Sequence, residues 1–300
     1  MWLFLLTLFT DTSRVFPVSV APAESIRVTV TGSGPPVVLV PGLFGAAFGF
    51  RNLVPELTAA GFQAIVVEPL GFGSSPRPEK ANYSLTAQAD RIAAALDSLG
   101  IDGAIVVAHS LGASMAFRLA YRRPDLVRGL LSLDGGPTET AATPGFRRAM
   151  QYASWVKWMG GERRIRKTIR GYLVDGSGDP SWVTDEVVRG YTQGAVEDLD
   201  GTLKAYLRMA ASREPEKLVP HLSGIRCPVR LLIGGVKHGW GIRPEEIGLL
   251  GQRLAAFSVD TVPGAGAFVY EEQPHRVVQE VLALLAVEEA GRRVARGVAQ

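Results

Sequence analysis

The apolar residues of this chain fall into short segments, separated by glycine and proline, whose spacing changes between that of strands and that of helices. Residues 25–31 (SIRVTVT) alternate between polar and apolar, which predicts a strand with one buried face. Residues 37–40 (VVLV) are all apolar, which predicts a strand buried on both faces. Residues 85–99 carry apolar side chains at helical spacing and end before Gly100, which predicts a helix. The same reasoning predicts further strands at 62–68, 104–108, 129–133, 228–233 and 259–262, and further helices at 53–60, 111–121 and 277–286.

Strands that alternate with helices predict an α/β fold, with a mostly parallel central sheet covered by helices on both faces. In such sheets, ligands bind beyond the carboxyl ends of the strands. Residues 137–221 interrupt the alternation and are rich in Arg, Trp and Tyr. Helical stretches near 144–159, 162–174, 183–197 and 199–212 predict that this segment is an inserted helical cap. The core would then comprise residues 24–136 and 222–300.

The first 23 residues lie outside this pattern. Trp2 to Phe9 is an apolar run, and Ala21-Pro22-Ala23 resembles a signal-peptidase site, but no basic residue precedes the run. Two interpretations stay open: an export signal, or a flexible arm on a cytoplasmic protein. The run is much shorter than the ~20 residues that a membrane span needs, so we expect no stable membrane span.

Charge and cysteine content narrow the range of partners. The 32 basic and 29 acidic residues nearly balance, which argues against a nucleic-acid partner. A single cysteine, Cys227, excludes an intrachain disulfide and a multi-cysteine metal site. The four histidines show no ligand spacing, so we expect no metal and no other cofactor.

The most specific motif surrounds Ser110. A predicted strand ends at Ala108, and His109-Ser110-Leu111-Gly112 then leads into a predicted helix. This strand–turn–helix is the context of a nucleophile elbow, G-x-S-x-G in its common form, with Ala108 in place of the first glycine. Ser110 is therefore the candidate nucleophile.

Blocks on both sides of this elbow resemble the α/β-hydrolases, in particular the lipase, esterase and haloperoxidase-like branch. The blocks are GSGPPVVLVPGLFG, EPLGFGSSPRP, YSLTAQADRIAAALDSLGI, VVAHSLGA and PGAGAFVYEEQP, in family order. The resemblance implies an α/β-hydrolase fold over roughly residues 25–136 and 224–286. It also implies an oxyanion hole formed by the backbone N–H groups of Leu43 and Leu111. The His-Gly pair that the family carries after its third strand is Pro41-Gly42 here, which leaves backbone donors unaffected.

The resemblance implies an acid and a histidine that follow the serine along the chain. The position where the family usually has its aspartate holds His238. Some members place the acid one strand earlier, where this chain has Asp134 after a buried strand. Asp134 is therefore the candidate acid, and its alternative role is to cap the loop at Gly135 and Gly136.

The family histidine stands in a G-x-G-H-F block, but this chain has Ala267 there, in Gly264-Ala265-Gly266-Ala267-Phe268. Alanine cannot accept a proton. Three explanations stay open: an engineered replacement of histidine, a natural pseudoenzyme that keeps its pocket, or a rearranged triad in which His238 supplies the base to Ser110.

The cap predicts a covered and mostly apolar pocket. Phe44, Trp155 and Trp158 are candidate substrate-binding residues, although most cap aromatics would form the cap's own core. We expect a serine hydrolase of carboxylic esters or related acyl bonds, acting on a small, uncharged and moderately hydrophobic substrate. The absence of histidine at position 267 would impair it. A non-catalytic binding protein and a cofactor-free perhydrolase are the alternatives. A serine elbow disfavours dehalogenases and epoxide hydrolases, which use aspartate.

Overall fold

The computed structural model describes residues 13–141 and 161–298, and its centre is one eight-stranded sheet. The strands lie in the order β1-β2-β4-β3-β5-β6-β7-β8, and only the pairs that involve β2 are antiparallel. The strands are β1 (Arg14–Ala21), β2 (Glu24–Thr31), β3 (Pro36–Val40), β4 (Gln63–Glu68), β5 (Ala104–His109), β6 (Val127–Leu133), β7 (Val229–Gly234) and β8 (Phe257–Val262).

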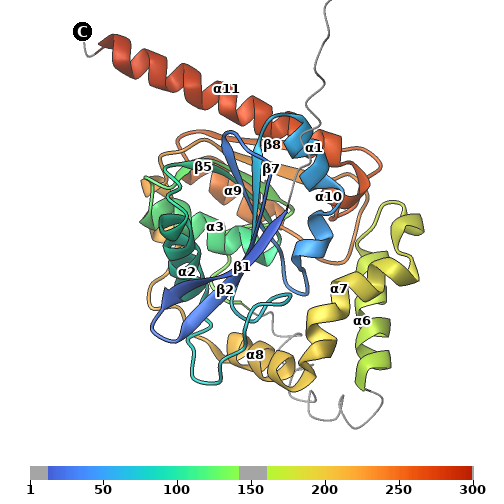
Figure 1. Cartoon of the computed structure of the whole chain (residues 1–300). Coiled ribbons are helices and arrows are strands. Elements are labelled where there is room, and N and C mark those ends of the chain that lie inside the picture. Colours follow the sequence, from blue (N-terminus) through green and yellow to red (C-terminus); the bar gives the residue numbers. More distant parts are fainter. Residues whose placement is uncertain (1–12, 142–160, 299–300) are drawn as a thin grey trace, which may run out of the picture.

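Helices cover both faces of this sheet (Figure 1). The α-helices of the core are α1 (Leu53–Ala59), α2 (Leu85–Ser98), α3 (Leu111–Arg122), α9 (Pro244–Arg253), α10 (Val269–Glu272) and α11 (Pro274–Val298). Those of the cap are α6 (Gly161–Asp175), α7 (Asp185–Glu197) and α8 (Leu199–Ala211). Short 3₁₀ helices are η1 (Ala47–Phe50), η2 (Pro180–Trp182) and η3 (Val219–Gly224). The fold is the α/β-hydrolase fold with an inserted helical segment, as the sequence predicts.

The central strands separate two hydrophobic cores, which explains why their residues are all apolar. Along β3, Val38 and Val40 pack into the core beneath α2 and α3, whereas Val37 and Leu39 pack into the core beneath α1 and α11. Successive side chains of a strand point to opposite faces, so both halves of the run are buried. All four residues have no exposed surface.

The cap lies at one end of the core, where Figure 1 shows α6, α7 and α8 together. Helix α7 packs on α6, and the buried side chains of Ile169, Leu173, Val187 and Val188 join the core that α1 and α11 cover. The cap is therefore continuous with one of the two hydrophobic cores. The predicted helix near 144–159 lies outside the described residues.

The N-terminal region differs from the sequence analysis, which leaves residues 1–23 outside the core. Residues 14–21 form β1, the edge strand, and pair with β2 from Arg14↔Val30 to Ala21↔Glu24. The Ala21-Pro22-Ala23 segment forms the turn of this hairpin, with Ala23 at φ 59°. Pro17 is compatible with this strand because an edge strand leaves one side without a partner. The apolar run from Trp2 to Phe9 lies outside the described residues.

Candidate active site

Ser110 lies in the sharp turn between β5 and α3, at the carboxyl edge of the sheet. Its backbone has φ 48° and ψ −116°, a strained conformation that costs a non-glycine residue about 1–3 kcal/mol. Ser110 is the N-cap residue of α3, but its side chain makes no capping hydrogen bond. A capping serine needs an extended backbone to reach the helix amides. The turn therefore leaves the hydroxyl available to the pocket that it lines.

Two glycines permit the close packing around this turn. A Cβ atom added at Gly112 would lie 2.5 Å from the carbonyl oxygen of Pro41, and one added at Gly135 would lie 2.5 Å from that of Ser110. The backbone N–H of Ser110 donates a 2.9 Å hydrogen bond to the carbonyl oxygen of Leu133. The ends of the neighbouring strands β3 and β6 thus hold the serine in position.

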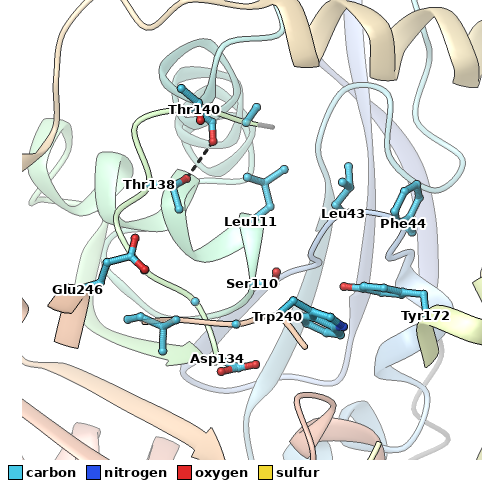
Figure 2. A pocket seen from close by; sticks show the side chains of 15 residues that line it. Leu43, Phe44, Ser110, Leu111, Asp134, Thr138, Thr140, Tyr172, Trp240 and Glu246 are labelled. Atoms are coloured by element: carbon cyan, nitrogen blue, oxygen red, sulfur yellow. Dashed lines mark hydrogen bonds between the residues drawn. The ribbon is translucent and has the colours of Figure 1, made fainter. Parts of the chain in front are cut away.

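A cavity of about 350 Å³ opens beside Ser110. Figure 2 shows the side chains that line it. Its walls come from the loops after β3, β5, β6 and β7, from the start of α3, from α9 and from helix α6 of the cap. The lining residues are Leu43, Phe44, Ser110, Leu111, Asp134, Gly135, Gly136, Thr138, Thr140, Ala141, Tyr172, Trp240, Gly241, Ile242 and Glu246. Four predicted residues, Leu43, Phe44, Leu111 and Asp134, therefore line the same pocket as the serine.

Asp134 and His238 form a direct hydrogen bond. Oδ2 of Asp134 lies 2.6 Å from Nε2 of His238, and both side chains are buried. Burial raises the pKa of Asp134, and the hydrogen bond to Asp134 raises the pKa of His238. The pair therefore retains its proton to a higher pH than an isolated histidine.

The second ring nitrogen of His238 is also engaged. Nδ1 lies 3.0 Å from the carbonyl oxygen of Val236, which only accepts, so Nδ1 carries a hydrogen. Nε2 then donates to the ionised carboxylate of Asp134, or accepts from the protonated carboxyl. Either way, both ring nitrogens are engaged, Nδ1 within its own loop and Nε2 by Asp134 in the loop after β6. His238 is not among the described residues that line the Ser110 pocket.

Ala267 lies in the loop between β8 and α10 and is fully buried. Its N–H donates a 2.7 Å hydrogen bond to the carbonyl oxygen of Gly176, in the segment that follows α6. The loop that carries position 267 is therefore in contact with the cap.

The carboxylate of Glu272 strengthens this contact. It accepts hydrogen bonds from the N–H groups of Gly178 and Asp179 on the cap side, each at 2.8 Å. Its other oxygen accepts from the N–H of Gly266 at 2.7 Å. We refer to Glu272 and these three amides as the Glu272 clasp.

Tyr172 and Trp240 are site residues that the sequence analysis does not select. Tyr172 is in α6, and its hydroxyl is within hydrogen-bonding reach of that of Ser110. Its ring stacks on Trp240, with centroids 4.6 Å apart and planes inclined by 16°. The sequence gives a signal only for Trp240, which stands two residues after His238 in a loop at the carboxyl edge of the sheet. Nothing local relates Tyr172 to Ser110.

His109 is adjacent to the nucleophile but points into the interior. Its ring packs 5.3 Å from Phe268 and 5.1 Å from Tyr270, measured between centroids, beside the backbone of Ala267. Burial lowers the pKa of His109 to about 3, so the ring is neutral at neutral pH. Its place is in the core beneath the elbow.

The remaining predicted residues carry less information. Trp155 and Trp158 lie outside the described residues. Phe44 has φ 63° and contacts Tyr172 and Tyr206 edge-on, at 5.7 and 5.2 Å between centroids. Across residues 13–141 and 161–298, no group of His, Cys, Asp and Glu could hold a metal ion. No helix in the same ranges has the length and apolar character to cross a bilayer.

Comparison with known proteins shows that this chain is similar to hydrolases. Residues 35–167 match a family model described as alpha/beta hydrolase fold. The sn-1-specific diacylglycerol lipase ABHD11 of Mus musculus is 27% identical over 278 residues, which is 84% of this chain and 81% of that protein. The 2-(acetamidomethylene)succinate hydrolase of Mesorhizobium japonicum is 26% identical over 263 residues, 86% of this chain and 90% of that protein.

The solved structure of epoxide hydrolase CorEH without ligand is similar in fold. It has a TM-score of 0.76 and 21% identity, and the match covers 92% of this chain and 99% of that chain. At this identity the likeness concerns the fold alone.

Proposed function

Because this chain has the α/β-hydrolase fold and is homologous to enzymes with that fold, we propose that it is a serine hydrolase of carboxylic esters or related acyl bonds. The observation that carries the proposal is the conformation of Ser110. A strained turn at the end of β5 presents an uncapped hydroxyl to a pocket, which is the arrangement of a nucleophile elbow.

In this proposal Ser110 Oγ attacks the carbonyl carbon of the substrate. The N–H groups of Leu43 and Leu111, whose residues line the pocket beside the serine, stabilise the oxyanion that develops. Loss of a single donor in such a hole costs about 2.7–4 kcal/mol in other serine hydrolases, so two donors supply a large part of the catalysis.

The rate is limited by the lack of a base at Ser110. Ala267 occupies the position of the family histidine, and both nitrogens of His238 are engaged, one by the carbonyl oxygen of Val236 and the other by Asp134. A positioned base contributes typically 10²–10⁴-fold. We therefore propose a turnover that is slow but real, supported by the oxyanion hole and substrate binding.

The pocket favours a small and moderately hydrophobic ester. Leu43, Phe44, Leu111, Tyr172 and Trp240 form much of its wall. Its charged side chains, Asp134 and Glu246, are both acidic, which disfavours an anionic substrate. The diacylglycerol lipase and the succinate-derivative hydrolase are consistent with acyl chemistry, of which the lipase-type uncharged ester fits this lining better.

An epoxide hydrolase activity is not favoured in spite of the shared fold. Those enzymes form an ester on an aspartate, whereas this elbow carries Ser110. A serine at this point is suited to acyl transfer.

A second candidate function is the retention of a small apolar ligand without turnover. It is favoured by the engagement of His238, which leaves Ser110 without an imidazole partner in the described residues. It requires that a ligand raise the melting temperature and that Ser110→Ala alter neither binding nor hydrolysis.

One experiment separates the two functions. The initial rate of p-nitrophenyl butyrate hydrolysis is measured for the parent and Ser110→Ala, with labelling by a fluorophosphonate probe in parallel. A serine hydrolase gives a rate and a label that both disappear in Ser110→Ala. A binding protein gives no label, and the same background rate in both.

A further inference from the structure

Helix α6 of the cap places a tyrosine hydroxyl at the candidate nucleophile. The hydroxyls of Tyr172 and Ser110 are within hydrogen-bonding reach, and both side chains line the same pocket. Figure 2 shows the phenol oxygen on the side of the ring that faces Ser110. Among the described residues, no other side chain forms a hydrogen bond with the Ser110 hydroxyl. Tyr172 is thus the polar partner of the serine.

Packing fixes the position of this phenol independently of its hydroxyl. The ring stacks on Trp240 at 4.6 Å, and Phe268 and Phe44 contact it edge-on at 5.6 and 5.7 Å. A phenylalanine at position 172 would keep all three ring contacts. The role of the hydroxyl can therefore be tested without removing the ring.

The protonation of Tyr172 decides what it can do. Burial and the nearby charge of Asp134 raise the pKa of Tyr172, so the hydroxyl is protonated at neutral pH. A protonated phenol has one hydrogen to donate and lone pairs that accept. It cannot hold an extra proton as an imidazole does, but it can accept one hydrogen while it donates its own.

We propose that Tyr172 is a catalytic residue that relays the proton of Ser110 to the leaving group, an inference that rests on the proposed esterase function. In acylation, the bond between Ser110 Oγ and the carbonyl carbon forms, and the serine proton moves to Oη of Tyr172. The proton of Tyr172 moves to the leaving oxygen as the bond between that oxygen and the carbonyl carbon breaks.

Deacylation uses the same relay in reverse. Water attacks the acyl carbon and gives a proton to Oη of Tyr172. Tyr172 returns its proton to Ser110 Oγ as the acyl bond breaks. The products are a carboxylic acid and an alcohol, and the phenol is neutral at both ends of each step.

This mechanism makes the role of Tyr172 depend on the leaving group. An alkoxide is strongly basic and must be protonated as it departs, whereas p-nitrophenolate leaves readily as an anion and the serine proton can then pass to water. Removal of the relay should therefore slow an alkyl ester much more than an aryl ester with the same acyl group.

The test compares kcat/KM for ethyl butyrate and p-nitrophenyl butyrate in the parent and in Tyr172→Phe. We expect the ratio of the ethyl to the p-nitrophenyl value to fall by about 100-fold, the low end of the effect of general acid–base catalysis. Because both substrates are measured on one preparation, the ratio does not depend on the fraction of folded protein.

Tyr206→Phe is the matched control. Tyr206 is a buried cap tyrosine in α8 that also contacts Phe44 edge-on, but it is not among the described residues that line the Ser110 pocket. The relay requires that this control retain the parent ratio. A similar fall in both variants would overturn the relay, because the effect would then come from the cap as a whole.

Fluorophosphonate labelling separates the failure of the relay from that of the proposed function. An unchanged ratio in Tyr172→Phe, with Ser110 still labelled, rejects the relay and leaves the hydrolase intact. Absence of labelling at Ser110 in the parent rejects both.

Discussion

Nε2 of His238 lies 2.6 Å from Oδ2 of Asp134, a hydrogen bond that joins the loops after β7 and β6. It brings together the candidate acid and the one histidine that the sequence places near it. Both ring nitrogens of His238 are engaged in this arrangement. The pair therefore stabilises the edge of the sheet, and it supplies no free nitrogen for proton transfer from Ser110.

The stability of this pair should depend on pH in a defined direction. The pKa of His238 is raised in the folded state, so its contribution is complete below the ordinary histidine value of about 6.5 and is lost as pH rises through the raised value. Asp134→Asn should lower the free energy of unfolding by about 1–3 kcal/mol, the cost of a buried polar group without its partner. Urea denaturation should show a larger difference between parent and variant at pH 6 than at pH 8. An equal or larger difference at pH 8 would show that Asp134 does not raise the histidine pKa.

The strained backbone at Ser110 predicts that glycine at this position gives a more stable protein than alanine, although neither residue supports activity. Glycine adopts a positive φ without penalty, so Ser110→Gly should be more stable than Ser110→Ala by about 1 kcal/mol, while both lose ester hydrolysis. Ala116→Gly, within α3, is the control and should lose at least about 1 kcal/mol. If glycine proved less stable than alanine at position 110 as well, the backbone there would be unstrained.

A histidine introduced at position 267 should supply Ser110 with a base. Ala267→His should raise turnover of p-nitrophenyl butyrate at least ~100-fold. Because Ala267 is fully buried, the larger side chain should also cost about 1–3 kcal/mol of stability. Ala267→Asn adds a polar side chain that cannot act as a base, and it should show no gain in rate. Equal rates in the two variants would mean that a side chain at position 267 does not reach the hydroxyl of Ser110.

The backbone around the elbow should be sensitive to a single methyl group. Gly135→Ala places a Cβ atom 2.5 Å from the carbonyl oxygen of Ser110, so we expect a loss of about 1–3 kcal/mol together with a fall in fluorophosphonate labelling. Gly248→Ala, on an open face of α9, should instead gain up to about 1 kcal/mol from helix propensity and keep full labelling. Normal labelling of Gly135→Ala would show that the elbow can relax.

Much of the fold follows from local pattern, because buried parallel strands need apolar residues on both faces. The run Val37–Val40 therefore predicts β3 to within one residue. Strand β1 is less evident, because Pro17 and its adjacency to the apolar N-terminal run obscure its alternation. Helix α9 is not predicted, since Gly248 and Gly251 weaken its helical pattern.

The candidate site also contains residues that the sequence predicts and residues that it does not. Ser110, Asp134 and His238 lie at the ends of adjacent strands, so strand order alone brings them to one edge of the sheet. Tyr172 reaches this edge from a helix of the cap, and its position depends on how α6 packs against Trp240 and Phe268. Such packing between distant segments has no local signature. The sequence motif therefore indicates the candidate nucleophile but not Tyr172 beside it.

The Glu272 clasp also affects how tightly any ligand can bind. A ligand that enters by displacing the segment after α6 must separate the N–H groups of Gly178 and Asp179 from one carboxylate oxygen. Part of the free energy gained inside the pocket is then used to break these bonds. The measured affinity will therefore be weaker than the contacts inside the pocket imply, and a ligand small enough to pass without moving the cap will lose nothing.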